Sequence, residues 1–232
     1  MKGKLIIIEA GSDASGKATQ TKKLFSRMKS SGYKIRKVEY PNYKSNSSAL
    51  VKMYLNGEFG YRPEDVNAYA ASTFFAVDRY ASYVKEWRTY YENGGIVLAD
   101  RYTTSNMVHQ ASKIDDESER NEYLNWLWDL EFVKLGLPIP DIVIFLDVPT
   151  LITNNLISKR YNKITGGHKK DIHESDTAYL GKTYLNACRV AEKYGWKRIQ
   201  CIKDGCLRSI EDIHNDIFEY VIKELPLQGL NY

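Results

Sequence analysis

The sequence predicts an α/β fold in which a doubly wound, five-stranded parallel sheet carries helices on both faces. Short, almost entirely apolar segments rich in β-branched residues alternate along the chain with longer segments of helical character, which is typical of repeated βαβ units. The short segments lack the polar–apolar alternation of a sheet with one solvated face, so we expect each to be covered on both sides. A glycine-rich turn that ends in a lysine follows the first of them.

Five segments are expected to be parallel strands joined by right-handed crossovers. Four of them are rich in β-branched residues and the fifth is weaker; in chain order they are residues 5–8, 35–40, 96–99, 142–146 and 198–202.

Helices are expected between and after these strands. Pro63 is followed by two acids, and this pattern predicts a helix start, since proline is tolerated in the first turn and acids complement the helix dipole. The Asn-Gly-Gly sequence at 93–95 is expected to end that segment. The predicted helices cover residues 17–30, 63–91, 104–112, 117–134, 150–160, 174–194 and 209–223.

Length and composition indicate one globular domain over residues 1–232. A net charge of +4 suits small anionic ligands but is too small for a nucleic-acid-binding surface. No segment approaches membrane-spanning length, and the three cysteines show no paired spacing, which fits a reducing compartment. We therefore expect a cytoplasmic protein with neither a nucleic-acid nor a membrane partner.

The turn after the first strand is the strongest local signal of function. A glycine-rich strand-to-helix turn exposes successive backbone N–H groups, the helix N-terminus adds positive potential, and a lysine reaches the outer phosphates of a nucleotide. The alternative, a glycine-rich turn with an exposed lysine, is disfavoured by the strand before it and the helix after it. The residues expected to bind ATP are Gly11, Ser12, Asp13, Ala14, Ser15, Gly16, Lys17, Ala18 and Thr19.

Residues 9–20 (Glu-Ala-Gly-Ser-Asp-Ala-Ser-Gly-Lys-Ala-Thr-Gln) resemble the phosphate loop of thymidylate kinases. Further segments are similar to motifs of that family, in the same order: Tyr40-Pro41, Phe-Phe-Ala-Val-Asp-Arg at 74–79, Asp-Arg-Tyr-Thr-Thr-Ser at 100–105, and Pro-Asp-Ile-Val-Ile-Phe-Leu-Asp at 140–147. The resemblance covers most of residues 4–160 and is weaker beyond.

The resemblance implies a P-loop nucleoside monophosphate kinase fold and the transfer of the γ-phosphoryl group of Mg–ATP to thymidine monophosphate. It also implies a homodimer formed by helix packing. The aromatic residues Tyr123, Trp126 and Trp128 could form such a face, or could simply belong to the core.

Phe75 and Arg79 are four residues apart and are expected to share one helix face, where a ring could stack on a base and a guanidinium could grip a phosphate. Without the resemblance, a core phenylalanine beside a surface arginine is an equal alternative.

Asp100 and Arg101 end a predicted strand, at the sheet edge where open α/β folds bind ligands. We expect Asp100 to hold Mg²⁺ through water and Arg101 to bind the acceptor phosphate; a surface salt bridge is the alternative. By resemblance, Lys17, Arg101 and Asp13 are catalytic, Asp13 bonds the deoxyribose 3′-hydroxyl, and the acceptor site also includes Pro41, Ser105, His109 and Gln110. The alternatives are that Asp13 only shapes the turn and that Ser105 or Gln110 is a helix cap or a solvated side chain.

Two positions depart from the family pattern in ways that affect function. Ala18 stands where a serine or threonine hydroxyl normally meets Mg²⁺. His109 stands where the family usually has the tyrosine or phenylalanine that crowds out a ribose 2′-hydroxyl, so the exclusion of ribonucleotides is expected to be weaker.

Residues 159–172 form a basic segment that contains glycines. By resemblance this segment is a lid that closes over ATP, although a solvated charged face is the alternative. Arg160 is expected to be its catalytic residue, because a bidentate guanidinium suits a migrating phosphoryl group.

Two alternatives to this function stay open on the sequence alone. One is a kinase that accepts another deoxynucleotide or a nucleoside. The other is a nucleotide-binding regulatory protein that has lost turnover, with Ala18 as the lesion.

Overall fold

The computed structural model describes residues 2–11, 15–150, 152 and 177–225. Its centre is a five-stranded sheet in the order β2-β3-β1-β4-β5, and every neighbouring pair is parallel. The strands are β1 (Lys4–Ala10), β2 (Ile35–Glu39), β3 (Ile96–Asp100), β4 (Ile142–Asp147) and β5 (Lys197–Gln200). The predicted fold class and strand set are confirmed. The expectation that every strand is covered on both sides is wrong for the edge strands β2 and β5, each of which exposes more than one side chain.

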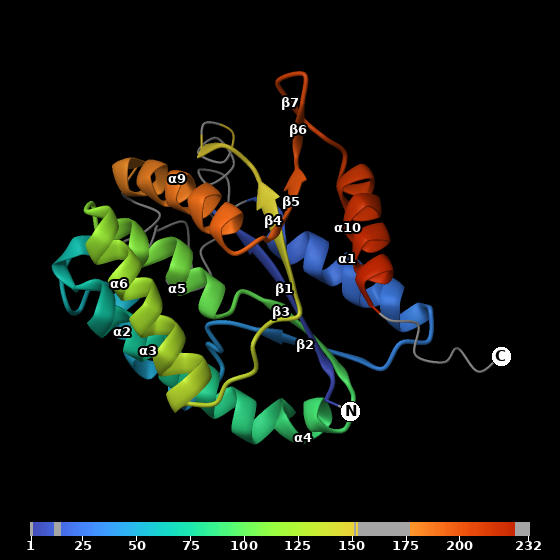
Figure 1. Ribbon diagram of the computed structural model, residues 1–232, viewed down its shortest axis with the longest axis horizontal. Helices are drawn as coiled ribbons and strands as arrows, with labels where there is room; N and C mark the ends of the chain where they lie inside the picture. Colours follow the sequence, from blue (N-terminus) through green and yellow to red (C-terminus); the bar gives the residue numbers. More distant parts are fainter. Residues whose placement is uncertain (1, 12–14, 151, 153–176, 226–232) are drawn as a thin grey trace.

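Helices cover both faces of this sheet, as Figure 1 shows. Helices α1 and α10 lie on one side, and α2, α3, α5 and α6 lie on the other. Their bounds are α1 (Lys17–Ser30), α2 (Ala49–Leu55), α3 (Ala68–Ser82), α4 (Arg88–Glu92), α5 (Thr103–His109), α6 (Glu117–Trp128), α9 (Thr177–Lys193) and α10 (Ile210–Glu224).

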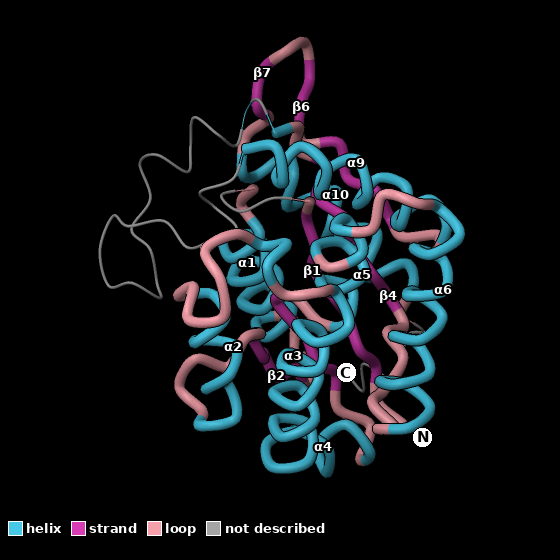
Figure 2. The backbone as a smooth tube through the Cα atoms, turned by 90° about the vertical axis from the view of Figure 1, so that its left-hand side faces the viewer, coloured by secondary structure: helices cyan, strands magenta, loops and turns pink. Residues whose placement is uncertain are grey.

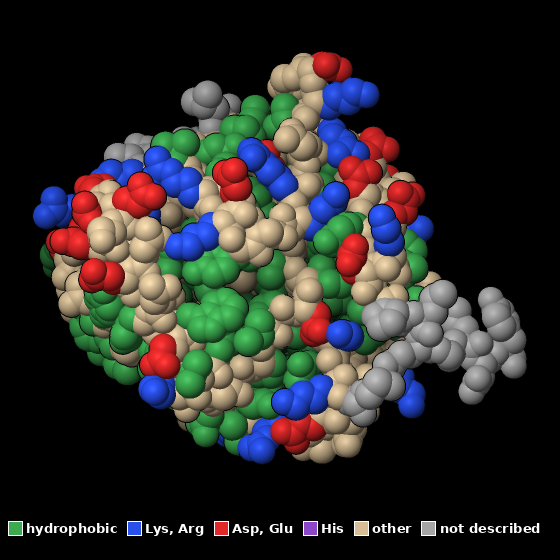
Figure 3. Space-filling model, viewed as in Figure 1, with side chains coloured by type: hydrophobic (Ala, Val, Ile, Leu, Met, Phe, Trp, Pro, Cys, Tyr) green, Lys and Arg blue, Asp and Glu red, His purple; other side chains and the backbone are tan. Residues whose placement is uncertain are grey.

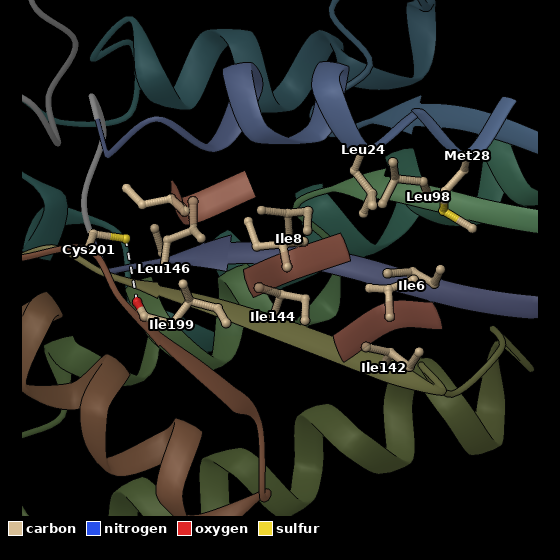
Figure 4. Close-up of a cluster of buried hydrophobic side chains, with 14 of the residues drawn as sticks. Ile6, Ile8, Leu24, Met28, Leu98, Ile142, Ile144, Leu146, Ile199 and Cys201 are labelled. Atoms are coloured by element: carbon tan, nitrogen blue, oxygen red, sulfur yellow. Dashed lines mark hydrogen bonds between the residues drawn. The ribbon is translucent and has the colours of Figure 1, made fainter. Parts of the chain in front are cut away.

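The central strand β1 supplies both halves of the core. Ile6 and Ile8 pack with Leu24, Ile144 and other side chains beneath α1 and α10 (Figure 4). Leu5 and Ile7 point to the opposite face and join a cluster that contains Trp87 and Tyr102. Because successive side chains of a strand alternate between faces, an uninterrupted apolar run fills both cores at once.

The prediction of one continuous helix over residues 63–91 is wrong. Pro63–Asp65 forms a 3₁₀ turn, and the backbone is extended at Val66, so α3 begins only after Asn67, whose side chain accepts a hydrogen bond from the Ala70 N–H. A π-helical stretch, Tyr83–Trp87, then separates α3 from α4. The helix begins after Asn67 because this side chain satisfies one of the first N–H groups of α3, which have no partner within the helix.

Two further elements differ from the prediction. The fifth strand ends at Gln200, and Ile202–Lys203 pairs instead with Cys206–Leu207 in an antiparallel hairpin, β6–β7, which projects from the body in Figure 2. Helix α2 was not predicted, because its seven residues are too few to show a helical period.

The aromatic residues considered for a dimer face belong largely to the core. Tyr123 is completely buried, Trp126 packs edge-on against Tyr69, and Trp128 stacks on Tyr194. Helix α6 is shorter than predicted, since Asp129–Lys134 is π-helical.

The predicted helix at 150–160 and the basic segment at 159–172 lie outside the described residues, apart from Thr150 and Ile152. Within the described part of the chain, no helix is both long and apolar enough to cross a bilayer.

Candidate active site

The turn from β1 into α1 leaves backbone donors available for an anion. Gly16 precedes α1 with φ +86, a left-handed conformation that favours glycine. Among the described residues no side chain caps the helix start, and the first turn of α1 contains no acid that would compete for its N–H groups. Ser15 adds a buried hydroxyl for which the described residues supply no hydrogen-bond partner.

Lys17 and the two residues that follow it differ in their exposure to solvent. Lys17 is buried, whereas Ala18 and Thr19 are exposed on the first turn of α1. Ser12, Asp13 and Ala14 lie outside the described residues, so their predicted roles stay predictions.

Helix α9 packs directly against the start of this loop. A Cβ at Gly11 would lie 3.1 Å from the Tyr184 Cα and 3.1 Å from the Ala187 Cβ. A side chain at this position would therefore be tightly packed against α9 and would require it to move by a few tenths of an ångström.

The carboxyl ends of three strands meet beside the loop. Ile8 of β1 and Glu39 of β2 both stand opposite Asp100 of β3. Burial raises the pKa of the Asp100 carboxyl, while the positive charges of Lys17 and Arg101 act in the opposite direction. Two cations from different elements thus act on one carboxylate at this edge of the sheet.

Arg101 turns sharply away from the end of β3. Its φ is +68, which is unusual for a residue other than glycine, and its N–H donates to the Ile8 carbonyl at 3.2 Å. The guanidinium Nη1 lies 2.8 Å from the His109 Nε2 and 3.4 Å from the Ser105 Oγ. The structure therefore brings together three of the residues predicted for the acceptor site.

A buried carboxylate that was not predicted organises this cluster. Glu9 is completely buried at the end of β1 and accepts hydrogen bonds from the Ala10 N–H, Thr104 Oγ1 and Ser105 Oγ at 3.0, 2.9 and 2.5 Å. It also lies 3.6 Å from the Arg101 Nη1. The available signal was an acid closing an apolar strand, next to the phosphate loop.

Phe75, which is predicted to stack on a base, lies on α3 beside Tyr54. Its ring is only partly buried and meets the Tyr54 ring edge-on, with 6.2 Å between centroids. Pro41 follows β2 in a cis peptide with Tyr40, and the next residue, Asn42, donates its N–H to Asp78 of α3 at 2.7 Å. Gln110 is buried, and no described group bonds its amide oxygen.

Arg79 is not placed as predicted. Its side chain is 2% exposed, and it forms a two-pronged ion pair with Glu131 at 2.7 and 2.5 Å. Burial by itself would lower the pKa of the Arg79 guanidinium, but attraction to Glu131 and their hydrogen bonds raise it. The positive charge of Arg79 is neutralised by a carboxylate, so the predicted grip on the acceptor phosphate has no support from this geometry.

The fold and the site define a class of enzyme: a P-loop nucleoside monophosphate kinase, with a glycine-lysine turn after the first strand and Arg101 after the neighbouring strand, both at the carboxyl edge of a parallel sheet. The family model described as thymidylate kinase matches residues 8–217. The chain belongs to the thymidylate kinase family.

Relatives and a solved structure agree with this assignment. Thymidylate kinase of Mycobacterium tuberculosis is 30% identical over 193 residues, which cover 83% of this chain and 87% of the relative. A probable thymidylate kinase of Pyrococcus horikoshii is 30% identical over 230 residues, covering 97% and 98%. The structure of thymidylate kinase from Candida albicans superposes with a TM-score of 0.69 over 96% of this chain and 92% of that one, at 20% identity, and supports the fold.

Proposed function

We propose that this chain transfers the γ-phosphoryl group of ATP to thymidine monophosphate, giving thymidine diphosphate and ADP. The observation that carries the proposal is that Lys17, at the start of α1, and Arg101, in the turn after β3, both act electrostatically on the Asp100 carboxyl. A donor phosphate bound by Lys17 and an acceptor phosphate bound by Arg101 would then face each other across that carboxylate. Phosphoryl transfer needs mainly this positioning and charge neutralisation.

In this arrangement each residue has a simple task. The N–H groups at the start of α1, the Ser15 hydroxyl and Lys17 hold the donor phosphates. Arg101 holds the acceptor phosphate, and the partly exposed ring of Phe75 stacks on the thymine. No side chain has to remove a proton, because a phosphate monoester oxygen is already largely ionised near neutral pH.

The residues fit a magnesium ion that is bound mainly by the nucleotide. No group of three or more acidic, histidine or cysteine side chains among the described residues could form a complete protein site for a metal. Asp100 supplies one carboxylate beside Lys17, and Mg²⁺ bound to nucleotides typically keeps several waters and one or two protein carboxylates. When bound, the ion would neutralise charge on the phosphates.

Asp13 and Arg160 lie outside the described residues, and His109 bears on the choice of sugar. Asp13 would bond the 3′-hydroxyl, and Arg160 in the basic segment would stabilise the migrating group; both roles rest on the family resemblance. His109, held against Arg101, would discriminate less strongly against a 2′-hydroxyl than a larger ring.

We also propose a homodimer, with the exposed face of α3 at its interface. Apolar side chains are exposed along one face of α3 and its π-helical continuation, at Tyr69, Val77, Tyr80 and Val84. Such a stripe on a helix face is suited to packing against its own copy about a two-fold axis.

Charge does not favour a nucleic-acid partner. On the face shown in Figure 3, lysine and arginine side chains are interspersed with acidic ones rather than gathered in a basic patch. A cytoplasmic location remains a prediction from the cysteine pattern.

The test is ADP release from ATP and Mg²⁺ over a panel of nucleoside monophosphates and nucleosides. We expect turnover to be fastest with thymidine monophosphate and to be abolished by Lys17→Met. Faster turnover with another acceptor would redirect the proposal to that substrate. ATP binding without any acceptor-dependent ADP release would indicate a regulatory protein and overturn it.

A further inference from the structure

Glu131 is a fully buried carboxylate that belongs neither to the phosphate loop nor to the cluster around Arg101. It is 0% exposed and lies in the π-helical stretch Asp129–Lys134 after α6. Two of its partners come from other elements: Arg79 of α3, at 2.7 and 2.5 Å, and the Thr103 hydroxyl at the start of α5, which donates at 2.7 Å. One side chain therefore joins three helical segments.

The hydrogen-bond network of Glu131, Arg79 and Thr103 includes the two residues that directly follow Arg101. Besides bonding Glu131, Arg79 directs its Nη1 at the Tyr102 carbonyl, 3.4 Å away. Glu131 itself holds Thr103. Two consecutive residues are thus tied to the buried ion pair, one through its backbone and the other through its side chain.

Tyr102 and Thr103 directly follow Arg101, so contacts that hold them also restrain the turn at Arg101. Arg101 has a φ of +68, and Tyr102 precedes α5 without a side-chain cap. A left-handed residue other than glycine persists only where the structure on both sides fixes it. On one side the Arg101 N–H bonds the Ile8 carbonyl, and on the other side the Arg79–Glu131 pair supplies the restraint.

Stability alone does not account for this arrangement. Removing two charges from water is costly, and replacing a buried ion pair by apolar side chains is often neutral or stabilising. The surroundings are apolar or aromatic, with Tyr102 and Tyr123 close enough to interact electrostatically with the pair. In addition, π-helical stretches such as the one that carries Glu131 are frequent at functional sites.

We propose that Glu131 is a positioning residue for the acceptor site: through Arg79 and Thr103 it fixes the turn at residues 101–103 and so aims the Arg101 guanidinium at the acceptor phosphate. The inference rests on the proposed function of Arg101. It assigns to Arg79 a role in the same network rather than direct contact with the phosphate.

The test compares variants of the full chain that separate positioning from stability. Thr103→Val removes the hydroxyl that donates a hydrogen bond to Glu131, and Thr103→Ser keeps that hydroxyl. The double variant Arg79→Met with Glu131→Leu removes both buried charges together, so no unpaired charge is left behind. Lys4→Met breaks the ion pair with Asp141 at the opposite end of β1 and serves as the control.

For each variant the dissociation constants of thymidine monophosphate and of ATP are measured by calorimetry, together with Tm and amide hydrogen exchange at 101–105. We expect acceptor binding to weaken about fivefold in Thr103→Val and more in the double variant, with ATP binding unchanged within about twofold. Thr103→Ser and Lys4→Met should bind both ligands as the unaltered chain does. Amide hydrogen exchange at 101–105 should accelerate only in Thr103→Val and in the Arg79→Met, Glu131→Leu double variant.

The proposal is overturned if the double variant folds with an unchanged Tm, binds the acceptor normally and shows unchanged exchange at 101–105. It is equally overturned if acceptor and ATP binding weaken together, since that reports a general loss of structure. Should the unaltered chain not bind thymidine monophosphate at all, the proposed function fails by itself. The exchange at 101–105 then still decides whether Glu131 holds the turn.

Discussion

The Nη1 nitrogen of Arg101 lies 2.8 Å from the Nε2 nitrogen of His109. A guanidinium can only donate hydrogen bonds, so Nε2 must be the acceptor and the imidazole is assigned as neutral, with its proton on Nδ1. His109 thereby orients the guanidinium that we assign to the acceptor phosphate.

Replacing His109 should separate its hydrogen bond from its size. We expect His109→Leu to raise the KM for thymidine monophosphate about tenfold, because the charged donor loses its acceptor. His109→Gln, which offers an amide oxygen, should stay within about threefold of the unaltered enzyme. Equal effects of the two substitutions would mean that the hydrogen bond to Arg101 does not matter. The same assays with the ribose analogue of the acceptor measure sugar discrimination.

Ala18 offers a test of metal ligation at the phosphate loop. Its side chain is exposed on the first turn of α1, so a larger residue can be introduced without disturbing the core. We expect Ala18→Thr to lower the Mg²⁺ concentration that supports half-maximal turnover, since a hydroxyl is a good ligand for this ion. Ala18→Val has the same shape without the hydroxyl and should not. If Ala18→Thr left the Mg²⁺ dependence unchanged, the missing ligand would be immaterial.

Lys113 should make the stability of the fold depend on pH. Burial lowers the pKa of its ammonium from 10.5 to about 7, and its Nζ donates to Tyr54 Oη and the Val66 carbonyl at 2.8 and 2.9 Å. Between these two pKa values the unfolded chain binds a proton that the folded chain does not. The free energy of unfolding should therefore rise with pH, by at most about 1.4 kcal/mol per unit.

Urea unfolding between about pH 7 and pH 8.5 measures this slope, below the range in which tyrosines titrate. Lys113→Met should remove most of it. A slope that is the same in both proteins would contradict the lowered pKa of Lys113.

Two glycines should respond in opposite directions to alanine. Gly16 has φ +86, where a Cβ costs about 1 kcal/mol, so Gly16→Ala should lower the free energy of unfolding by that amount. Gly181 lies within α9, and a Cβ there would meet no neighbouring atom within 4 Å, so Gly181→Ala should raise it by about 0.5–1 kcal/mol through helix propensity. Both values come from denaturant unfolding, and destabilisation by Gly181→Ala would show that this part of α9 is not helical in solution.

The exposed stripe on α3 should control assembly. Val77 is 54% exposed at its centre, and Val77→Glu would place a charge in the proposed two-fold interface. We expect sedimentation to change from dimer to monomer with an unchanged circular dichroism spectrum. Ile139→Glu alters a side chain that is 52% exposed outside the stripe and should leave the assembly intact. A dimer that survives Val77→Glu would place the interface elsewhere.

Local patterns in the sequence were sufficient for the strands and for the start of α1 at Lys17. An apolar run such as Leu5 to Ile8 encodes a strand buried on both faces, and the turn after it carries its own glycines and lysine. Helix boundaries were less predictable where a single side chain decided them, as with the Asn67 cap that set the start of α3. A helix cap depends on one hydrogen bond, whereas the hydrophobic period that predicts a helix or strand is averaged over many residues.

What the sequence by itself determined is therefore the fold class, the family motifs and the identity of the charged residues near the sheet edge. Only the tertiary structure decided what each charge does: Arg79 and Arg101 look equivalent in the chain, yet one pairs with Glu131, 52 residues away, and the other turns toward His109. The physical reason is that the role of a charge depends on its nearest opposite charge and on its exposure to water. Both are set by packing between elements that are distant in sequence.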